Sequence, residues 1–203
     1  MFNKFCFLLV SVFVLFSNAI YANGDTERLS LKDVAVEDGA LCLAAAREAG
    51  VEYDVNLDLL HAISAVESGR WDNLQNRYVA WPWTVNVRGK GYYFASRQEA
   101  VDAVKDFQAK GIKSIDVGCM QINLKYHGKA FKSVDEAFDP IKNVRYSAKF
   151  LRRLYSRNGN SWKKAAKRYH SSNPVLGEAY TQRLERRFEK FKVAGFAKNS
   201  TLF

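Results

Sequence analysis

The sequence contains little proline, cysteine or histidine. Of its 203 residues, 3 are proline, 3 are cysteine and 3 are histidine. The histidines, at positions 61, 127 and 170, form no metal-ligand spacing such as His-Glu-x-x-His, so neither a metal site nor another cofactor is expected. Internal repeats and low-complexity segments are absent from the sequence, which excludes a repeat architecture. With 48% hydrophobic and 14% aromatic residues, the chain can still bury the core of a single domain.

Long apolar runs are limited to one, at residues 5–16, where only Ser11 interrupts it. A lysine precedes the run, and small residues follow it up to Ala19 or Ala22, as is typical of a secretory signal peptide over residues 1–22. The run is shorter than the roughly 20 residues of a membrane-spanning helix, although a retained anchor is the alternative. Cys6 lies within the run and not at a cleavage site, which argues against a lipid-modified end. We therefore expect a periplasmic protein with no stable membrane insertion after cleavage.

Cleavage would leave two cysteines, Cys42 and Cys119. An oxidising compartment would allow them to pair, and only one intramolecular pairing exists. A loop of that length would stabilise the fold by about 4 to 5 kcal/mol in the chain-entropy model. Two buried free thiols are the alternative.

Basic residues outnumber acidic ones by 31 to 21, which gives a formal net charge of +10. They concentrate in the stretches KKAAKR at 163–168 and RLERRFEKFK at 183–192. Such an excess favours a polyanionic partner, namely a wall polymer, an anionic membrane surface or nucleic acid. Export makes nucleic acid the least consistent of the three, and we expect none. These stretches could instead be solvated helix faces.

The pattern of elements predicts a mainly α fold, α+β in a lysozyme-like proportion. After a polar leader at 23–39 we expect helices at 40–49, ending before Gly50, and from Asn56, which can cap the next one. TVNVRGKGYYF at 84–94 reads as a β-hairpin, and Ser96 caps a helix at 97–109 that Gly111 stops. Further helices are expected at 141–155, 162–170 and 178–193. The hairpin and its following helix form an insertion, at about 70–116, in a helical domain.

The stretch LLHAISAVESGRW at 59–71 ends an apolar helix on a carboxylate, Glu67. Gly69 is the residue expected to leave the helix in a left-handed conformation, so the chain should turn away just after Ser68. The negative end of the helix dipole and the apolar neighbours both disfavour an ionised side chain there, as a general acid requires. Taken alone, however, most glutamates near helix ends are simply solvated.

Three separated elements give this glutamate its context: AVESG at 65–69, DVGCMQIN at 116–123 and AAKRYH at 165–170. In this order they resemble the soluble lytic transglycosylase (SLT) domain family, which is related in fold to goose-type lysozyme. FDPIKNVRYSAKFLRRLY at 138–155 also resembles the family's asparagine-containing helix. The resemblance covers about residues 40–185. It places the catalytic domain at 40–195, with a C-terminal tail at 196–203.

The resemblance implies cleavage of the β-1,4 bond between N-acetylmuramic acid and N-acetylglucosamine in peptidoglycan. Glycosidases usually need two carboxylates, one as acid and one to activate water or attack the sugar. In the SLT family one glutamate, here Glu67, acts first as acid and then as base toward the muramic acid 6-hydroxyl. That hydroxyl closes a 1,6-anhydro ring, so no water and no second carboxylate are required. The N-acetyl group of the substrate is thought to stabilise the charge at the anomeric carbon.

The resemblance also implies substrate-binding roles. Ser68 matches a serine near the substrate N-acetyl group, although its hydroxyl could instead bond back to a helix carbonyl. Gly118 would permit close approach of backbone to sugar. Met120 and Gln121 match residues that line the cleft, although Met120 could equally be core. Asn123 is expected to fix loop geometry as much as to touch sugar.

Two tyrosines complete the implied site. Tyr169 matches the tyrosine of the third element, which would donate a hydrogen bond to the catalytic carboxylate or to the substrate. Tyr180, on the last helix, is a further candidate, with simple packing as the alternative.

The position of Asn123 bears on the reaction, because goose-type lysozyme has an aspartate there. An amide cannot act as a base, which favours transglycosylation over hydrolysis. Asp72 and Asp116 are the remaining candidates for a second carboxylate. Asp72 reads as an exposed loop residue and Asp116 as a residue that makes a local turn hydrogen bond.

The chain departs from the family pattern in three respects. The third element usually reads Tyr-Asn, and here His170 follows Tyr169. Cys119 replaces an apolar residue, and a bond from it to Cys42 would tie the active-site segment to the first helix. The interval from Glu67 to Gly118 is also much longer than the minimal family spacing, because it holds the insertion. The aromatic residues of this insertion could stack on sugars, contact a partner or form their own small core; they are Trp81, Trp83, Tyr92 and Tyr93.

The leading hypothesis is an exported, monomeric lytic transglycosylase that opens peptidoglycan strands, with a protein of an envelope-spanning machine as an open further partner. A muramidase that uses water is the first alternative. A catalytically silent peptidoglycan-binding or assembly protein is the second. Glu67, Gln121 and Tyr169 are all present, which argues against a silent protein.

Overall fold

The computed structural model describes the backbone of residues 31–73, 76–193 and 201–203, and side chains from residue 38 onward. The predicted signal peptide, residues 23–30 of the leader and most of the C-terminal tail lie outside these residues. The described elements, in chain order, are α1 (Leu31–Tyr53), α2 (Leu57–Glu67), β1 (Gly69–Asp72), β2 (Arg77–Ala80), β3 (Thr84–Val87), β4 (Lys90–Tyr93), α3 (Arg97–Ala109), β5 (Ile115–Val117), β6 (Ile122–Asn123), α4 (Leu124–His127), a 3-10 turn (Gly128–Ala130), α5 (Val134–Phe138), α6 (Pro140–Arg157), α7 (Trp162–His170) and α8 (Pro174–Val193).

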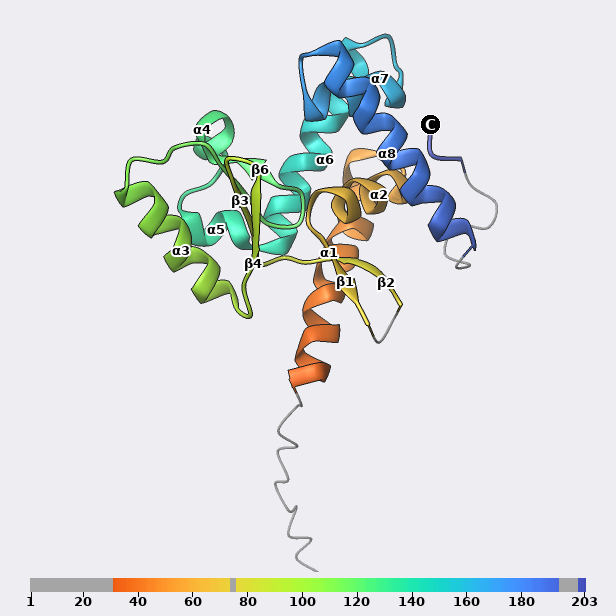
Figure 1. Ribbon diagram of the computed structural model, residues 1–203. Coiled ribbons are helices and arrows are strands. Elements are labelled where there is room, and N and C mark those ends of the chain that lie inside the picture. Colours follow the sequence, from red (N-terminus) through yellow and green to blue (C-terminus); the bar gives the residue numbers. More distant parts are fainter. Residues whose placement is uncertain (1–30, 74–75, 194–200) are drawn as a thin grey trace, which may run out of the picture.

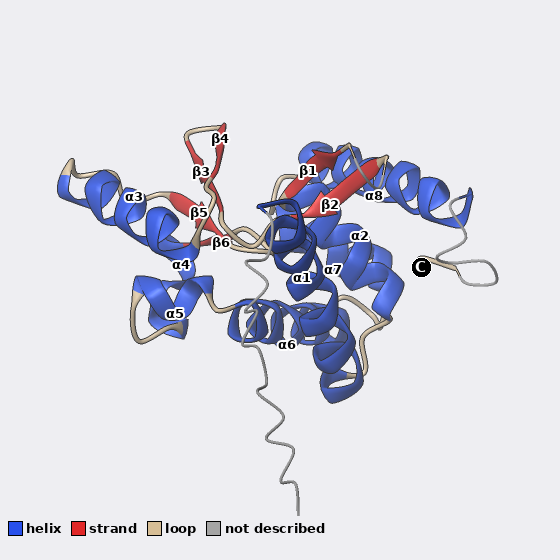
Figure 2. Cartoon of the chain, turned by 90° about the horizontal axis from the view of Figure 1, so that it is seen from below, coloured by secondary structure: helices blue, strands red, loops and turns tan. Residues whose placement is uncertain are grey.

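Two separate hydrophobic cores organise these elements (Figure 1). The larger core belongs to a helical body, in which α1, α2, α6 and α8 bury side chains such as Leu60, Leu151 and Leu184. The smaller core belongs to an insertion lobe, where strands β3 and β5 pack with helices α3 and α5 around Val85 and Phe138. Seen from below, β3–β6 and α3–α5 lie to one side of the helical body (Figure 2). The mainly α, lysozyme-like fold is confirmed.

The insertion lobe follows from its local sequence signals. β3 and β4 form the predicted antiparallel hairpin, and its turn residues Arg88 and Gly89 both have positive φ, 55° and 83°, as a tight two-residue turn requires. β5 pairs with β3 and β6 with β5, which makes a four-stranded antiparallel sheet. The Ser96 side chain caps α3, and Gly111, at φ 78°, follows its end. These features confirm the hairpin and the helix at 97–109.

Helix α1 is longer than predicted at both ends. It begins at Leu31, within the segment expected to be a polar leader, and continues through Gly50 to Tyr53. A Cβ at Gly50 would lie 2.9 Å from the Val55 carbonyl oxygen, so this glycine allows the following turn to pack closely and does not end the helix. α8 also begins earlier than predicted, at Pro174, because the Asn173 side chain accepts hydrogen bonds from Val175 N and Leu176 N.

The exit from α2 differs from the prediction in its conformation. The helix ends at Glu67, as expected, and Ser68 is its C-cap with φ −118°. Gly69 has no positive φ and instead begins β1, which pairs with β2 in a hairpin that the sequence did not predict. A Cβ at Gly69 would lie 2.2 Å from the Ala65 carbonyl oxygen. Glycine is therefore required here by close approach to the helix backbone and not by a left-handed turn.

A disulfide bond joins Cys42 of α1 to Cys119, with 5.6 Å between the Cα atoms. The predicted pairing is confirmed, and it fixes the segment between β5 and β6 to the helical body. Among the described residues, no helix is long and apolar enough to cross a membrane.

Candidate active site

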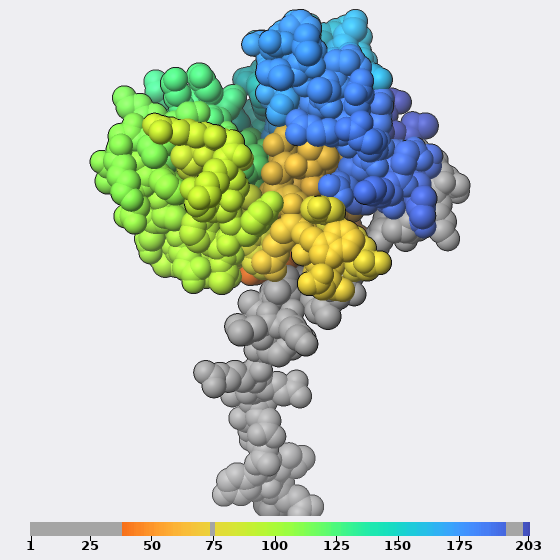
Figure 3. All heavy atoms as spheres, in the orientation of Figure 1, coloured from red at the N-terminus to blue at the C-terminus, as the bar shows by residue number. Residues whose placement is uncertain are grey.

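A cleft of about 280 Å³ lies where the helical body meets the insertion lobe. In the space-filling view the insertion lobe and the C-terminal helices flank the α2–β1 segment (Figure 3). Side chains from both lobes line the cleft: Glu67, Asp116, Gln121, Ile122, Asn123, Tyr126, His127, Phe150, Tyr169 and His170. Four other residues that the sequence singled out therefore line this cleft together with Glu67, namely Asp116, Gln121, Asn123 and Tyr169.

Glu67 is the last residue of α2, and its side chain is 16% exposed. One carboxylate oxygen lies 3.9 Å from Nδ1 of His170. At this distance a protonated imidazole would form an ion pair with the carboxylate. Glu67 is thus largely withdrawn from water while it still faces the cleft.

His170, which stands where the family usually has asparagine, is held from two sides. Its ring stacks on Tyr180, with 4.4 Å between centroids and 1° between planes. Its Nε2 lies 3.4 Å from a guanidinium nitrogen of Arg183. These contacts aim the other ring nitrogen, Nδ1, at Glu67.

The two tyrosines have different surroundings. The Tyr169 hydroxyl donates to the Met120 carbonyl oxygen at 2.8 Å and lies 3.2 Å from Ser147 Oγ, so its hydrogen bonds hold the backbone of the second motif. Tyr180 is fully buried, and among the described residues its hydroxyl has no partner of normal hydrogen-bond geometry. Burial raises the pKa of the Tyr180 phenol well above its usual range, and the nearby Glu67 carboxylate raises it further. Tyr180 is therefore the tyrosine better placed to donate toward Glu67.

Asn143, on α6, holds the second motif in place. Its side-chain nitrogen donates to the carbonyl oxygens of Val117 and Ala137, at 3.0 and 2.9 Å, and its side-chain oxygen accepts from Met120 N at 2.9 Å. Gly118 has φ 79°, and a Cβ there would lie 2.5 Å from the Asn143 amide nitrogen. Asn143 thus makes a close approach that requires glycine at 118.

Ser68 and Met120, predicted to bind substrate, are both fully buried. The Ser68 hydroxyl lies 3.0 Å from the Ser64 carbonyl oxygen and 2.8 Å from that of Cys119. This is the alternative in which the hydroxyl bonds back to a helix carbonyl, with an added bond to the second motif. Met120 packs in the larger core, its other alternative. Both residues support the cleft from behind.

Gln121 and Asn123 line the cleft and are also anchored. Gln121 has φ 46°, and its side-chain nitrogen donates to the carbonyl oxygens of Thr84 and Gly118, each at 3.0 Å. Asn123 donates to Asp116 Oδ1 at 2.8 Å and to Ser114 Oγ at 2.9 Å, and it caps α4 through Lys125 N. These bonds hold the connection from β6 into α4.

The two candidate second carboxylates are in different places. Asp72 lies on β1 opposite Arg77 and does not line the cleft. Asp116 lies on β5 opposite Asn123 and does line it, so its hydrogen bond is made across strands and not within a local turn. Burial raises the pKa of the Asp116 carboxyl, the Asn123 bond lowers it and the Glu67 charge raises it.

Five residues that line the cleft were not among the predicted site residues: Ile122, Tyr126, His127, Phe150 and His170. Tyr126 is 71% exposed, and His127 Nδ1 lies 2.7 Å from the Tyr146 hydroxyl. Burial lowers the pKa of His127. The only sequence signal for Tyr126 and His127 is that α4 follows directly after the second motif.

The aromatic residues of the insertion mostly form its own core. Trp81 and Trp83 are buried in this core, and the partly buried Tyr92 packs against the same core. The Trp83 indole nitrogen donates to Asp38 at 2.8 Å, while Tyr93 is exposed and donates to the Gly69 carbonyl oxygen at 3.1 Å. No group of histidine, cysteine and carboxylate side chains within the described ranges could hold a metal ion.

The sequence model of the transglycosylase SLT domain family matches residues 44–191. No curated protein and no solved structure matches the chain. The matched region spans well over half of the sequence and includes all three motifs, α6 and the cleft. The chain therefore belongs to the transglycosylase SLT domain family.

Proposed function

We propose that the protein is an exported lytic transglycosylase that cleaves the β-1,4 bond between N-acetylmuramic acid and N-acetylglucosamine in peptidoglycan. The observation that carries the proposal is the position of Glu67 in a chain of this family: a largely buried carboxyl group that ends a helix and faces a cleft between two lobes. A general acid must reach its substrate while it is partly protected from water.

Glu67 would donate its proton to the leaving oxygen as the bond from that oxygen to muramic acid C1 breaks. The muramic acid 6-hydroxyl would then attack C1 and return its proton to the Glu67 carboxylate. The product is a 1,6-anhydro ring, and no water is consumed. His170, 3.9 Å from Glu67, and the buried Tyr180 hydroxyl support this scheme as groups that orient the carboxyl group between its two roles.

Gln121 and Asn123 are the proposed substrate contacts on the insertion side of the cleft, because both line it. Tyr169, Gly118, Met120 and Ser68 act mainly by holding the second motif. The proposal includes a periplasmic, monomeric enzyme, with a partner in an envelope-spanning machine as the factor that localises it.

A muramidase that uses water is the second candidate, because Asp116 lines the same cleft as Glu67. Its carboxylate oxygen accepts a hydrogen bond from Asn123, which occupies part of its capacity to activate water. This bond favours the first candidate.

Digestion of purified peptidoglycan by the mature protein and by Glu67→Gln, with mass spectrometry of the released muropeptides, tests the proposal. We expect 1,6-anhydro products from the wild-type protein and none from the variant. Hydrated products would support the muramidase. Absence of release by the wild-type protein would support a silent binding protein.

A further inference from the structure

His170 contacts charged groups through both of its ring nitrogens. Its Nε2 lies 3.4 Å from a guanidinium nitrogen of Arg183, and its Nδ1 lies 3.9 Å from a carboxylate oxygen of Glu67. His170 is the last residue of α7, Arg183 belongs to α8 and Glu67 ends α2. The imidazole therefore connects an arginine on one helix with the carboxyl group at the end of another.

The contact with Arg183 determines where a neutral imidazole carries its proton. A guanidinium group has only N–H donors and stays charged, so Nε2 of His170 must accept in this hydrogen bond. A neutral imidazole has a single N–H, which must then lie on Nδ1. Because Nδ1 is the nitrogen that faces Glu67, the N–H is directed at the carboxyl group.

The same contact disfavours a charged imidazole. Both nitrogens of an imidazolium carry protons, so Nε2 of His170 would present an N–H to the N–H of Arg183, and the two positive charges would repel each other. Among the described residues no carboxylate forms an ion pair with Arg183, whereas Lys163 and Lys167 of α7 are each paired with a glutamate. The charge of Arg183 therefore acts on the imidazole without a neutralising neighbour in this part of the chain.

The charge of the imidazole decides where the proton of the Glu67–His170 pair lies. The two groups can share one proton in two ways: on the carboxyl group, beside a neutral imidazole, or on the imidazole, as an ion pair. Only the first arrangement leaves Glu67 with the proton that a general acid donates. The negative charge of Glu67 by itself favours the ion pair, and Arg183 opposes it.

An asparagine at position 170, which is usual in the family, would need no such neighbour. Its side-chain amide is neutral and always carries N–H donors. A histidine offers the same neutral donor only if it is uncharged and has its proton on the nitrogen that faces Glu67. With histidine at this position, a second residue must set the proton, and Arg183 is placed to do so.

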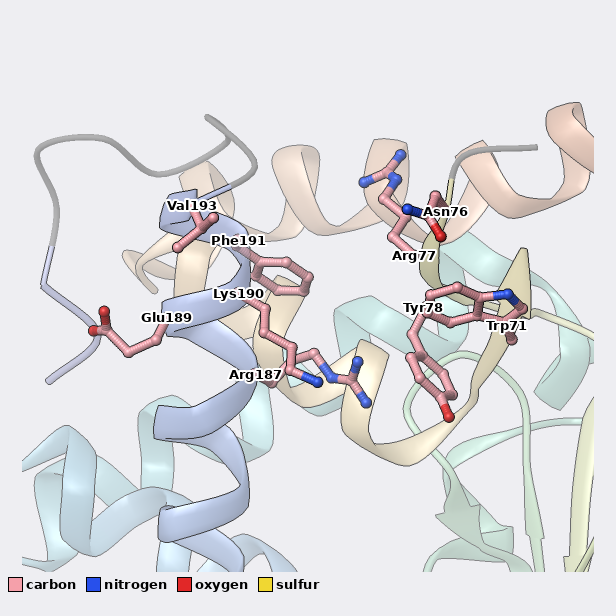
Figure 4. Close-up of a pocket in the computed structure, with 9 residues that line it drawn as sticks. All are labelled: Trp71, Asn76, Arg77, Tyr78, Arg187, Glu189, Lys190, Phe191 and Val193. Carbon is pink, nitrogen blue, oxygen red and sulfur yellow. The ribbon is translucent and has the colours of Figure 1, made fainter. Parts of the chain in front are cut away.

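Tyr180 holds the two side chains together. The imidazole of His170 stacks on the Tyr180 ring, with 4.4 Å between centroids, and the Arg183 guanidinium lies 5.4 Å from the centre of the same ring. Arg187, one turn further along α8, reaches instead toward Tyr78 on the β1–β2 hairpin (Figure 4), with its guanidinium 4.3 Å from the centre of that ring. Arg183 and Arg187 thus have similar aromatic contacts, but Arg183 also contacts a residue of the catalytic cleft.

We propose that Arg183 is a positioning residue for the reaction: it keeps His170 neutral, with the proton on Nδ1, so that the imidazole donates one N–H to Glu67 and does not take its proton. The proposal rests on the proposed function. As Glu67 gives its proton to the leaving oxygen, the Nδ1–H would stabilise the new carboxylate and leave it able to accept the proton of the muramic acid 6-hydroxyl. The 3.9 Å between Nδ1 and Glu67 would shorten in the substrate complex, as is common for catalytic hydrogen bonds.

Nuclear magnetic resonance of the mature protein with ¹⁵N-labelled histidine tests the position of the proton without turnover. The sequence has 3 histidines, and the spectrum of His170→Asn identifies the signals of His170. At neutral pH we expect a protonated Nδ1 and an unprotonated Nε2 in the wild-type protein, and a larger share of protonated Nε2 in Arg183→Gln. The matched control, Arg187→Gln, removes an equal charge from α8 and should leave the His170 signals unchanged. A wild-type protein with Nε2 protonated, or equal His170 signals in Arg183→Gln, would overturn the proposal.

Kinetics on peptidoglycan separate positioning from a structural role. Arg183→Gln should lower kcat by about fivefold at neutral pH with KM unchanged, a modest loss because Arg183 is exposed and water screens part of its charge. In the His170→Asn background the same substitution should have no further effect, since the amide needs no neighbour to set its protons. Arg187→Gln should leave kcat unchanged in both backgrounds.

An equal loss from Arg183→Gln in both backgrounds would overturn the proposal, because Arg183 would then act on the fold or on the substrate and not through His170. An unchanged kcat in the single variant would overturn it as well. If the wild-type protein cleaves no peptidoglycan, the proposed function fails, and the ¹⁵N spectra still decide whether Arg183 sets the proton of His170.

Discussion

The two sides of Glu67 differ in charge and in construction. The insertion side contains a second carboxyl group, Asp116, and neutral amides that are fixed by hydrogen bonds to backbone and to one another. The α8 side contains four cations on one helix face, and within the described ranges no carboxylate pairs with them. The two sides therefore present different chemistry: fixed amide and carboxyl groups on the insertion side, and positive charge on the α8 side.

Burial limits additional charge on both sides. It raises the pKa of Asp116 on the insertion side. On the α8 side it lowers the pKa of His61, which stacks on Phe191 with 4.2 Å between ring centroids, to about 4. Burial therefore disfavours the negative form of Asp116 on the insertion side and the positive form of His61 on the α8 side. Variants can test the two sides separately.

The largest expected effect is that of Glu67→Gln, which removes the group that both sides surround. Activity on peptidoglycan should fall by about a thousandfold or more, because a positioned acid and base contributes roughly 10² to 10⁴ in each role. The rate of muropeptide release measures it, with thermal unfolding as the control for folding. If the variant keeps more than a tenth of the activity, Glu67 is not the catalytic acid and base.

Asn143→Leu should disrupt the backbone of the second motif on the insertion side and leave the α8 side unchanged. It leaves three buried backbone groups without their partners, those of Val117, Ala137 and Met120, so the free energy of unfolding should fall by about 3 kcal/mol or more. Urea denaturation measures the change. Asn73→Leu, in an exposed turn, is the control and should change stability by less than about 0.5 kcal/mol. Equal effects of the two substitutions would contradict the supporting role of Asn143.

His61, which stacks on Phe191 of α8, should make the stability of the protein depend on pH. A histidine whose folded pKa lies below its unfolded value of 6.5 contributes stability that is present above pH 6.5 and is lost as the pH falls toward 4. The loss should approach about 3 kcal/mol over this window, since each unit of pKa difference is worth about 1.4 kcal/mol. Denaturation of the wild-type protein and of His61→Gln between pH 4 and 7.5 measures it. If the variant shows the same slope as the wild-type protein, another group is responsible.

His170→Asn restores the residue that the family usually has and should have the smallest effect. His170 is 3.9 Å from Glu67 and lies between the two sides, so its removal should change kcat by about tenfold or less and shift the pH profile of kcat. The stacking on Tyr180 would be lost, so unfolding of the variant should be measured in parallel. A change in stability alone, with an unchanged pH profile, would assign His170 a purely structural role.

The sequence predicts those elements whose signals are local. The cap at Ser96 and the turn at Arg88–Gly89 set the α3 helix and the β3–β4 hairpin, and both occur where predicted. The β1–β2 hairpin was missed because its four-residue strands show little alternation and its pairing depends on packing against α2.

The candidate site divides in the same way. The position of Glu67 at a helix end follows from the sequence, and so does the link between Cys42 and Cys119. The supporting roles of Ser68 and Gly118 do not, because their neighbours Cys119 and Asn143 are brought to them by the tertiary fold. The cations of α8 were visible as a basic stretch, but only the packing of α8 against α2 puts them beside Val66.

The central claim is that one carboxylate, Glu67, performs both proton transfers although Asp116 lies in the same cleft. The most direct measurement is digestion of peptidoglycan in ¹⁸O-labelled water by the wild-type protein and by Asp116→Asn. The account predicts muramic acid ends without ¹⁸O, in the 1,6-anhydro form, from both proteins, at rates within about tenfold of each other. Incorporation of ¹⁸O at muramic acid C1, together with loss of activity in Asp116→Asn, would contradict it.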